Sequence, residues 1–255
     1  MYPTRRSASG LVVLTLGGFG TDLGGGITSF VRRLTTDGFK TVVIQWRDSW
    51  LQSAEGEQVG PARLACRTAT AIQWIHDNLY GQLGLAASPR TCGFCVTGNS
   101  GGASQAAYAL SFYGLGGIID GAVLSGGPPH AAIAQGCLGE KGYAYDQDAA
   151  SKMDLSYGYL QGDGPCERND QSFAQHWRQD SVDVGGIYSL PNTRLVFLFV
   201  SGDPTTGPAH GKAYLARLRS AGSPYVSSAI VRGEVHTIEN LRQGRAALER
   251  ALLGS

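Results

Sequence analysis

Ser100 is the residue of this chain whose surroundings point most directly to chemistry. It lies in GNSGG (98–102), where the apolar run GFCVTGN (93–99) gives way to a helical pattern over 100–113. The G-x-S-x-G spacing alone has little specificity in a chain with 37 glycines. Its place between a buried strand and a helix is more specific, because a sharp turn there needs small neighbours and exposes the serine hydroxyl. The pattern predicts a nucleophile.

A serine hydroxyl needs a base within hydrogen-bond reach, and the sequence has five histidines. His236 is the strongest candidate, since it follows the apolar run VSSAIVRG (226–233) in a loop before the last predicted helix. His130 follows another predicted strand, where it would line a pocket. The other three are placed less well: His76 within a long predicted helix, His176 in an irregular segment and His210 at the start of a helix.

The base in turn needs a carboxylate that fixes its tautomer and stabilises its charged form. Asp203 follows the most apolar predicted strand, in LVFLFVSGDPTTG (195–207). A turn-forming aspartate before proline is the alternative interpretation. Glu234 is nearer to His236 along the chain but is expected to be exposed, and Asp120 precedes its strand, at the wrong end of the sheet. Asp203 is therefore the predicted acid.

Acyl chemistry also needs hydrogen-bond donors for the developing oxyanion. We expect one from the backbone N–H of Gly101 and the other from the glycine loop after the first strand, at Phe19 or else Gly18. A phosphate-binding loop is the alternative, but GGFGTDLGGG (17–26) lacks both the Gly-Lys-Ser/Thr ending and a dinucleotide-binding pattern. The residues expected to contact substrate beside these donors are Gly17, Asn99 and His130.

The elements that must position these residues alternate between strands and helices. Strands are predicted at 11–16, 41–46, 93–99, 121–126, 193–202 and 226–233, and helices at 28–39, 61–80, 100–113, 209–221 and 238–253. The strands are continuous apolar runs, which are typical of a sheet buried on both faces. We expect one α/β domain over 1–255, with a mostly parallel sheet of about six strands flanked by helices.

Residues 128–190 interrupt this alternation. They are rich in Gly, Gln, Asp and Tyr and show little periodicity, so we expect an irregular lid or cap inserted above the carboxyl ends of the strands. Cys137 and Cys166 lie in this segment, and a disulfide between them is one hypothesis, which would favour an oxidising compartment. Cys92 and Cys95 are interpreted as structural, because no second cysteine or histidine pair completes a zinc site.

Composition excludes several classes of partner. The chain has 21 Lys+Arg and 20 Asp+Glu, without a basic run, so nucleic acid and anionic membranes are not expected partners. No apolar run is long enough for a membrane span. The start, MYPTRRSASGLVVLTLGGFG (1–20), resembles a weak export signal, but its short apolar part is better explained as a first strand. The oligomeric state and the compartment stay open.

The chain order Ser100, Asp203, His236 on an alternating β/α pattern resembles the α/β-hydrolase superfamily. The strand–turn–helix around Ser100 and the glycine loop after the first strand carry the same resemblance, which covers roughly 11–127 and 192–253. It implies a serine nucleophile, an aspartate acid and a histidine base at these positions, and no metal or organic cofactor. The chain lacks the histidine that many lipases and esterases have before the glycines, and the superfamily's first hairpin.

The resemblance implies a carboxylesterase or lipase-like enzyme that acts on a small-molecule ester. A thioesterase, acyltransferase or peptidase using the same three residues remains an alternative, as does a hydrolase-like binding protein without activity. Fold resemblance supports the nucleophile better than the substrate.

Overall fold

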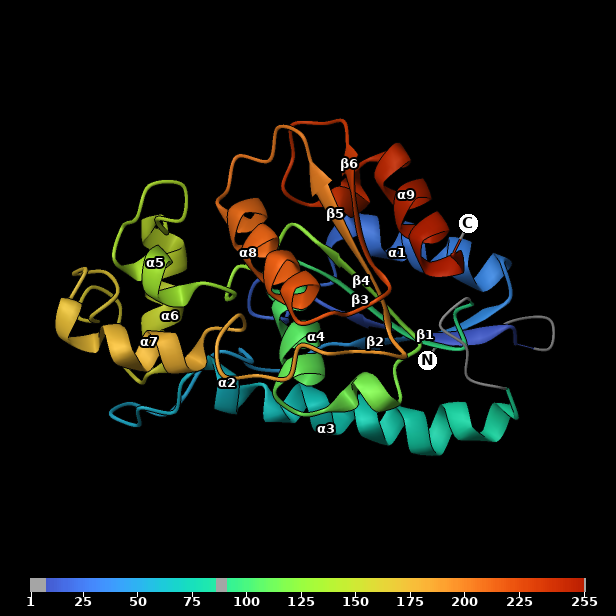
Figure 1. The fold of residues 1–255 in the computed structure, drawn as a ribbon, viewed down its shortest axis with the longest axis horizontal. Helices are drawn as coiled ribbons and strands as arrows, with labels where there is room; N and C mark the ends of the chain where they lie inside the picture. The colour runs from blue at the N-terminus through green and yellow to red at the C-terminus, as the bar shows by residue number, and fades with distance from the viewer. Residues whose placement is uncertain (1–7, 86–90, 255) are drawn as a thin grey trace.

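The centre of the molecule is one sheet of six parallel strands. The structure is a computed structural model that describes residues 8–85 and 91–254. The strand order is β2-β1-β3-β4-β5-β6 (Figure 1). Their bounds are β1 (Gly10–Thr15), β2 (Phe39–Ile44), β3 (Phe94–Asn99), β4 (Gly121–Ser125), β5 (Arg194–Val200) and β6 (Val226–Val231). The predicted fold class, an α/β sheet of about six strands flanked by helices, is confirmed, and every strand pair is parallel.

Helices cover both faces of the sheet. Apolar side chains of α1 (Gly24–Thr36) and α9 (Arg242–Leu253) form one core with the sheet. Those of α3 (Cys66–Ile75), α4 (Gly101–Ser111) and α8 (Gly207–Ser220) form the other. The single helix predicted over 61–80 is divided into α2 (Pro61–Leu64), α3 and a π-helical segment, η1 (His76–Tyr80).

Parallel pairing brings the carboxyl ends of the strands to one edge of the sheet. The register aligns Thr15 of β1 with Gly98 of β3, and Asn99 of β3 with Ser125 of β4. Val200 of β5 pairs with Val231 of β6 at the same edge. The chain therefore leaves five neighbouring strands at one rim, where open α/β sheets bind ligands.

The expectation that all strands are buried on both faces is wrong for β6. β1, β3 and β4 are buried along their whole length, but β6 is exposed at most positions. Ile230 of β6, for example, is 74% exposed. β6 is the last strand of the sheet, so only β5 pairs with it, and an apolar sequence pattern alone does not distinguish an edge strand from a central one.

The segment 128–190, called the insertion below, joins β4 to β5. It holds three short helices, α5 (Ile133–Cys137), α6 (Gln147–Ser156) and α7 (Ala174–Asp180), which gather at one side of the sheet (Figure 1). The sequence predicted an irregular segment; helices of 5, 10 and 7 residues are too short to give a clear periodic pattern. The insertion has a hydrophobic core of its own, to which Met153, Phe173 and Trp177 contribute.

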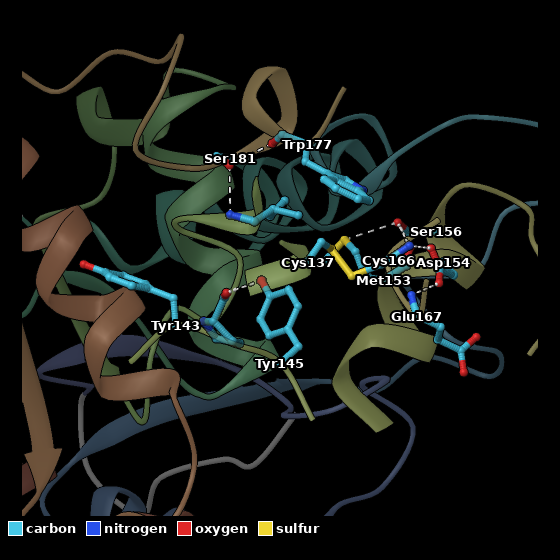
Figure 2. The surroundings of a disulfide bond; sticks show 12 residues. Cys137, Tyr143, Tyr145, Met153, Asp154, Ser156, Cys166, Glu167, Trp177 and Ser181 are labelled. Atoms are coloured by element: carbon cyan, nitrogen blue, oxygen red, sulfur yellow. Dashed lines mark hydrogen bonds between the residues drawn. A yellow bond between two sulfur atoms is a disulfide. The ribbon is translucent and has the colours of Figure 1, made fainter. Parts of the chain in front are cut away.

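A disulfide between Cys137 and Cys166 fastens the core of the insertion (Figure 2). The carboxylate of Asp154 in α6 accepts hydrogen bonds from the backbone amides of Cys166, at 2.8 Å, and Glu167, at 2.9 Å. The predicted pairing of the two cysteines is present. A second disulfide joins Cys92, which precedes β3, to Cys95 within β3, a pairing that the sequence did not predict.

The apolar part of the possible export signal forms β1, while the arginines before it lie outside the described residues. Within 8–85 and 91–254, no helix has the length and apolarity needed to cross a bilayer.

Candidate active site

Ser100 lies at the turn between β3 and α4 with a left-handed backbone conformation, φ 55° and ψ −122°. Such a conformation costs a residue with a side chain on the order of 1–3 kcal/mol and tends to occur at functional sites. The turn is tight enough to require glycines. A Cβ on Gly98 would lie 2.4 Å from the backbone carbon of Gly102, and one on Gly102 would lie 2.2 Å from the carbonyl oxygen of Thr15.

Hydrogen bonds hold this turn against the sheet. The amide of Ser100 donates to the carbonyl of Ser125 in β4, at 2.8 Å. The hydroxyl of Thr15 in β1 donates to the carbonyl of Gly102, at 2.8 Å. Both strands that flank β3, β1 and β4, therefore hold the turn by hydrogen bonds. The backbone conformation of Ser100 is stabilised by the sheet as well as by the turn itself.

His236 lies in the loop after β6 and is hydrogen-bonded to Asp203, which follows β5. Its Nδ1 is 2.9 Å from Oδ2 of Asp203 and 3.1 Å from Oδ1. The amide and hydroxyl of Thr205 donate to Oδ1 of Asp203, at 2.9 and 2.8 Å. Burial tends to raise the pKa of Asp203, but the hydrogen bonds from His236 and Thr205 outweigh it, so the pKa lies below its usual value.

Ser100 and His236 line the same cavity, which has a volume of about 830 Å³. The part of the chain that the structure describes has no hydrogen bond between the Ser100 hydroxyl and the His236 ring. Gly126, with φ 57°, leaves room for the ring: a Cβ there would lie 3.0 Å from Cε1 of His236. The aspartate–histidine pair is therefore formed, and Ser100 lines the same cavity as the histidine.

The glycine loop after β1 faces the turn at Ser100. A Cβ on Gly101 would lie 2.5 Å from the carbonyl oxygen of Gly18, so the two backbones are in contact. The amides of Gly18, Phe19 and Gly101 have no hydrogen-bond acceptor among the residues described. All three residues line the cavity, and Gly17 lines it with them. Unpaired amides at this position can bind a negatively charged oxygen.

Two tryptophans hold the glycine loop in place. The indole N–H of Trp50 donates to the carbonyl of Gly18, at 3.0 Å, and its amide donates to the carbonyl of Phe19, at 3.0 Å. The indole N–H of Trp46 donates to Oε1 of Gln105 in α4, at 2.8 Å. The side-chain Nε2 of Gln105 in turn donates to the carbonyl of Leu16, at 3.0 Å. Sequence reasoning missed Gln105, because nothing in a helix sequence marks which polar side chain faces inward.

The insertion supplies one wall of the cavity. Tyr145, Asp146, Asp148 and Lys152 are among the lining residues, and the ammonium group of Lys152 lies 5.2 Å from the centre of the Phe19 ring. The insertion thus reaches the loop that carries the unpaired amides.

The structure places the two other residues expected to contact substrate in different ways. Asn99 lines the cavity, but its Oδ1 accepts a hydrogen bond from the hydroxyl of Ser125, at 3.0 Å, and it is buried. His130 also lines the cavity, against the ring of Trp50, with centroids 5.5 Å apart. Burial lowers the pKa of His130 to about 3, so the ring is neutral near pH 7.

The remaining histidines, His76, His176 and His210, are not among the residues that line the cavity. His210 is buried in α8, where Nε2 is 2.9 Å from the carbonyl oxygen of Tyr143. His76 contacts Asp77, at 2.8 Å, and His176 stacks on Phe173. Among the described residues, no group of three or more His, Cys, Asp and Glu side chains is placed to hold a metal ion.

The six parallel strands, the strained serine after β3 and the loops after β1, β5 and β6 define the α/β-hydrolase fold. No family model and no curated protein sequence matches the chain. Solved structures match it over nearly its full length. A putative esterase from Staphylococcus aureus is 12% identical with a TM-score of 0.63, covering 98% of this chain and 77% of that one.

Two further structures are similar at somewhat higher identity. A hyperthermophilic esterase from the archaeon Pyrobaculum calidifontis is 21% identical with a TM-score of 0.58, covering 96% of this chain and 75% of the esterase. Brefeldin A esterase, a bacterial homologue of human hormone-sensitive lipase, is 20% identical with a TM-score of 0.59. That match covers 97% of this chain and 67% of the other. At these identities the likeness establishes the fold.

Proposed function

We propose that the protein is a serine hydrolase that cleaves carboxylic esters through an acyl-enzyme on Ser100. His236 is the base, Asp203 is the acid that orients it, and the amides of Gly101 and Phe19, or Gly18, bind the oxyanion. The observation that carries the proposal is the aspartate–histidine hydrogen bond of 2.9 Å at the wall of the cavity that Ser100 also lines. The esterases and lipases among the similar structures support ester substrates.

In this mechanism His236 takes the proton of Ser100 as the hydroxyl attacks the acyl carbonyl, and later gives it to the leaving alcohol. Water activated by His236 then hydrolyses the acyl-enzyme. The Asp203 carboxylate stabilises the imidazolium that forms in both steps. The mechanism requires a hydrogen bond between Ser100 and His236, which commonly tightens only when substrate is bound.

The insertion acts in this proposal as a cap over the site within a single domain. Its residues form part of the cavity wall, and its own core and disulfide allow it to keep its shape. We expect it to select among substrates by contacts with the parts of the ester remote from the carbonyl.

The test is covalent labelling with a fluorophosphonate, together with hydrolysis of p-nitrophenyl esters of graded chain length. We expect labelling of the wild type, none of Ser100→Ala, and a fall of at least about 10³-fold in kcat for that variant. Ser201→Ala, at an exposed Ser-Gly pair outside the cavity, is the matched control and should keep its label. A folded wild type that is not labelled and hydrolyses no ester would favour the binding protein.

The same assay separates the alternative activities, thioesterase and peptidase, that would also use Ser100, His236 and Asp203. Esters are compared with acyl thioesters and amides of the same acyl group. A peptidase that hydrolyses puromycin is among the similar structures, at 15% identity over 34% of that chain. Preference for the amide or the thioester by kcat/KM would replace the esterase proposal with the corresponding activity.

A further inference from the structure

Glu239 is a buried carboxyl group in the wall of the cavity that the mechanism does not use. It lies in the short helical segment η5 (Ile238–Asn240), three positions after His236. The residue is only 4% exposed, and it lines the cavity together with Ser100 and His236. Its Oε2 is buried and has no hydrogen-bond partner among the residues described.

The salt bridges among the described residues do not include the carboxyl group of Glu239. The side chain of Arg245 donates to the backbone carbonyl of Glu239, at 2.5 Å, and not to its carboxyl group. Lys152, which lines the same cavity, pairs with Asp148 instead. On the side of α1, the backbone of Glu239 lies against Gly26, where a Cβ would be 2.7 Å from its carbonyl oxygen. The backbone around Glu239 is therefore held on two sides while one carboxyl oxygen is left unsatisfied.

A buried polar atom without a protein partner is destabilising, and at a cavity wall a group that enters the cavity can supply the missing hydrogen bond. Burial raises the pKa of Glu239 to about 7, while its own backbone hydrogen bond and the charge of His236 oppose the shift. The carboxyl group is therefore present both protonated and ionised near neutral pH. A ligand hydroxyl suits both forms, because it can donate to a carboxylate and accept from a carboxylic acid. An ammonium group suits only the ionised form and would itself have to be desolvated.

The position of Glu239 also indicates which part of the ester it meets. In the proposed mechanism His236 delivers its proton to the leaving alcohol, so the alcohol part passes next to the imidazole. Glu239 follows His236 closely in the chain and interacts electrostatically with it. The acyl carbonyl, in contrast, is directed to the amides of the glycine loop and Gly101.

We propose that Glu239 is a specificity-determining residue that binds a hydroxyl group on the alcohol part of the ester. The preferred substrates are then esters of diols or polyols rather than of simple alkyl alcohols. This inference rests on the proposed function, since it requires an alcohol that leaves beside His236.

The experiment compares two series of butyrate esters, n-alkyl and ω-hydroxyalkyl, with alcohols of two to four carbons. Each kcat/KM is divided by the rate of the same ester with hydroxide, which removes differences in intrinsic reactivity. For the wild type we expect at least one hydroxyalkyl ester to exceed its alkyl counterpart about tenfold, the effect of one buried hydrogen bond. Glu239→Leu should bring this ratio close to one, and Glu239→Gln, which can still donate and accept, should keep it within about threefold.

Glu234→Leu is the matched control, because Glu234 is exposed, precedes His236 by two positions and does not line the cavity. It should leave the ratio as in the wild type. A wild type without preference in any pair, or a preference that Glu239→Leu retains, would overturn the inference while leaving the ester hydrolase standing. If Glu239→Leu does not fold, Glu239→Ala takes its place, with the same expected loss of the preference and the same outcomes that would overturn the inference. Hydrolysis of neither series would overturn the proposed function, and this inference with it.

Discussion

The Asp203 carboxylate is the most completely bound group of the candidate site. It accepts hydrogen bonds from the His236 ring and from the amide and hydroxyl of Thr205. Because its pKa lies below the usual value, it remains ionised through the neutral range. A carboxylate held in this way fixes the proton of His236 on Nδ1 and leaves Nε2 free to act as a base.

We predict that Asp203→Asn lowers kcat on p-nitrophenyl butyrate by about 10³–10⁴-fold, because the amide stabilises the wrong tautomer and does not balance the imidazolium charge. Steady-state kinetics with circular dichroism as a check of folding measures this. Glu234→Gln, an exposed acid close to the same histidine, should change kcat by less than about twofold. If Asp203→Asn kept more than a tenth of the activity, another group would have to be the acid.

Among single residues, the sequence identifies those whose side-chain chemistry and position at the end of a predicted strand both indicate a role in the site. Ser100, Asp203 and His236 meet that condition, and the structure brings the last two into hydrogen-bond contact. Gln105 and Glu239 do not meet it. Each is a polar residue in a helical segment, and only the packing of the chain turns it inward.

At the scale of elements, α4 packs closely against β1 beside the site. Helix α4 approaches the sheet through Gly102, which lies directly on the carbonyl of Thr15. Alanines at 103, 106 and 107 continue the contact, and all three are fully buried. Small side chains on this face let the helix begin at the turn that carries Ser100.

We predict that Gly102→Ala lowers the free energy of unfolding by about 1–3 kcal/mol, because the new Cβ would overlap backbone that cannot move aside. This corresponds to a fall in Tm of roughly 2–12 °C for a chain of this size, measurable by calorimetry. Gly117→Ala is the control, since a Cβ there meets nothing within 4 Å. Equal melting of both variants would mean that α4 can shift away from the sheet without loss.

Elements of the sheet follow from the sequence more closely than those of the insertion. Each predicted strand has its counterpart within a few residues, because long apolar runs between glycine-rich turns are strong signals. The order in which the strands pair, with β1 between β2 and β3, depends on contacts between distant segments. Helix α6 of the insertion begins at a cap, Asp146, whose carboxylate accepts a hydrogen bond from the amide of Ala149, while α5 and α7 have no side-chain cap.

At the scale of the whole molecule, the insertion has its own hydrophobic core and disulfide beside the sheet. Its core is separate from the two cores that flank the strands, and its disulfide closes a loop with a sequence separation of 29. In the chain-entropy model such a loop contributes roughly 3–4 kcal/mol. The cysteines alone suggested the pairing, but their meeting depends on the turn that Asp154 holds together.

We therefore predict that Cys137→Ala/Cys166→Ala lowers Tm by roughly 6–16 °C, taking about 2–4 °C per kcal/mol for a chain of this length. Scanning calorimetry of the wild type and the double variant measures the shift. Cys66→Ala, which removes an exposed free thiol, is the control and should melt like the wild type. A double variant with unchanged Tm would show that the core of the insertion holds without its covalent link.

The tryptophans behind the glycine loop have a practical consequence. The indole of Trp50 shares a hydrogen bond with the carbonyl of Gly18, one bond away from the amide of Phe19. Indole emission responds to changes in hydrogen bonding and polarity, so any movement of this loop on binding a ligand would alter the fluorescence of the native chain. We therefore expect ligand binding that moves this loop to be measurable from the emission of the native tryptophans, without a dye and before any bond is broken.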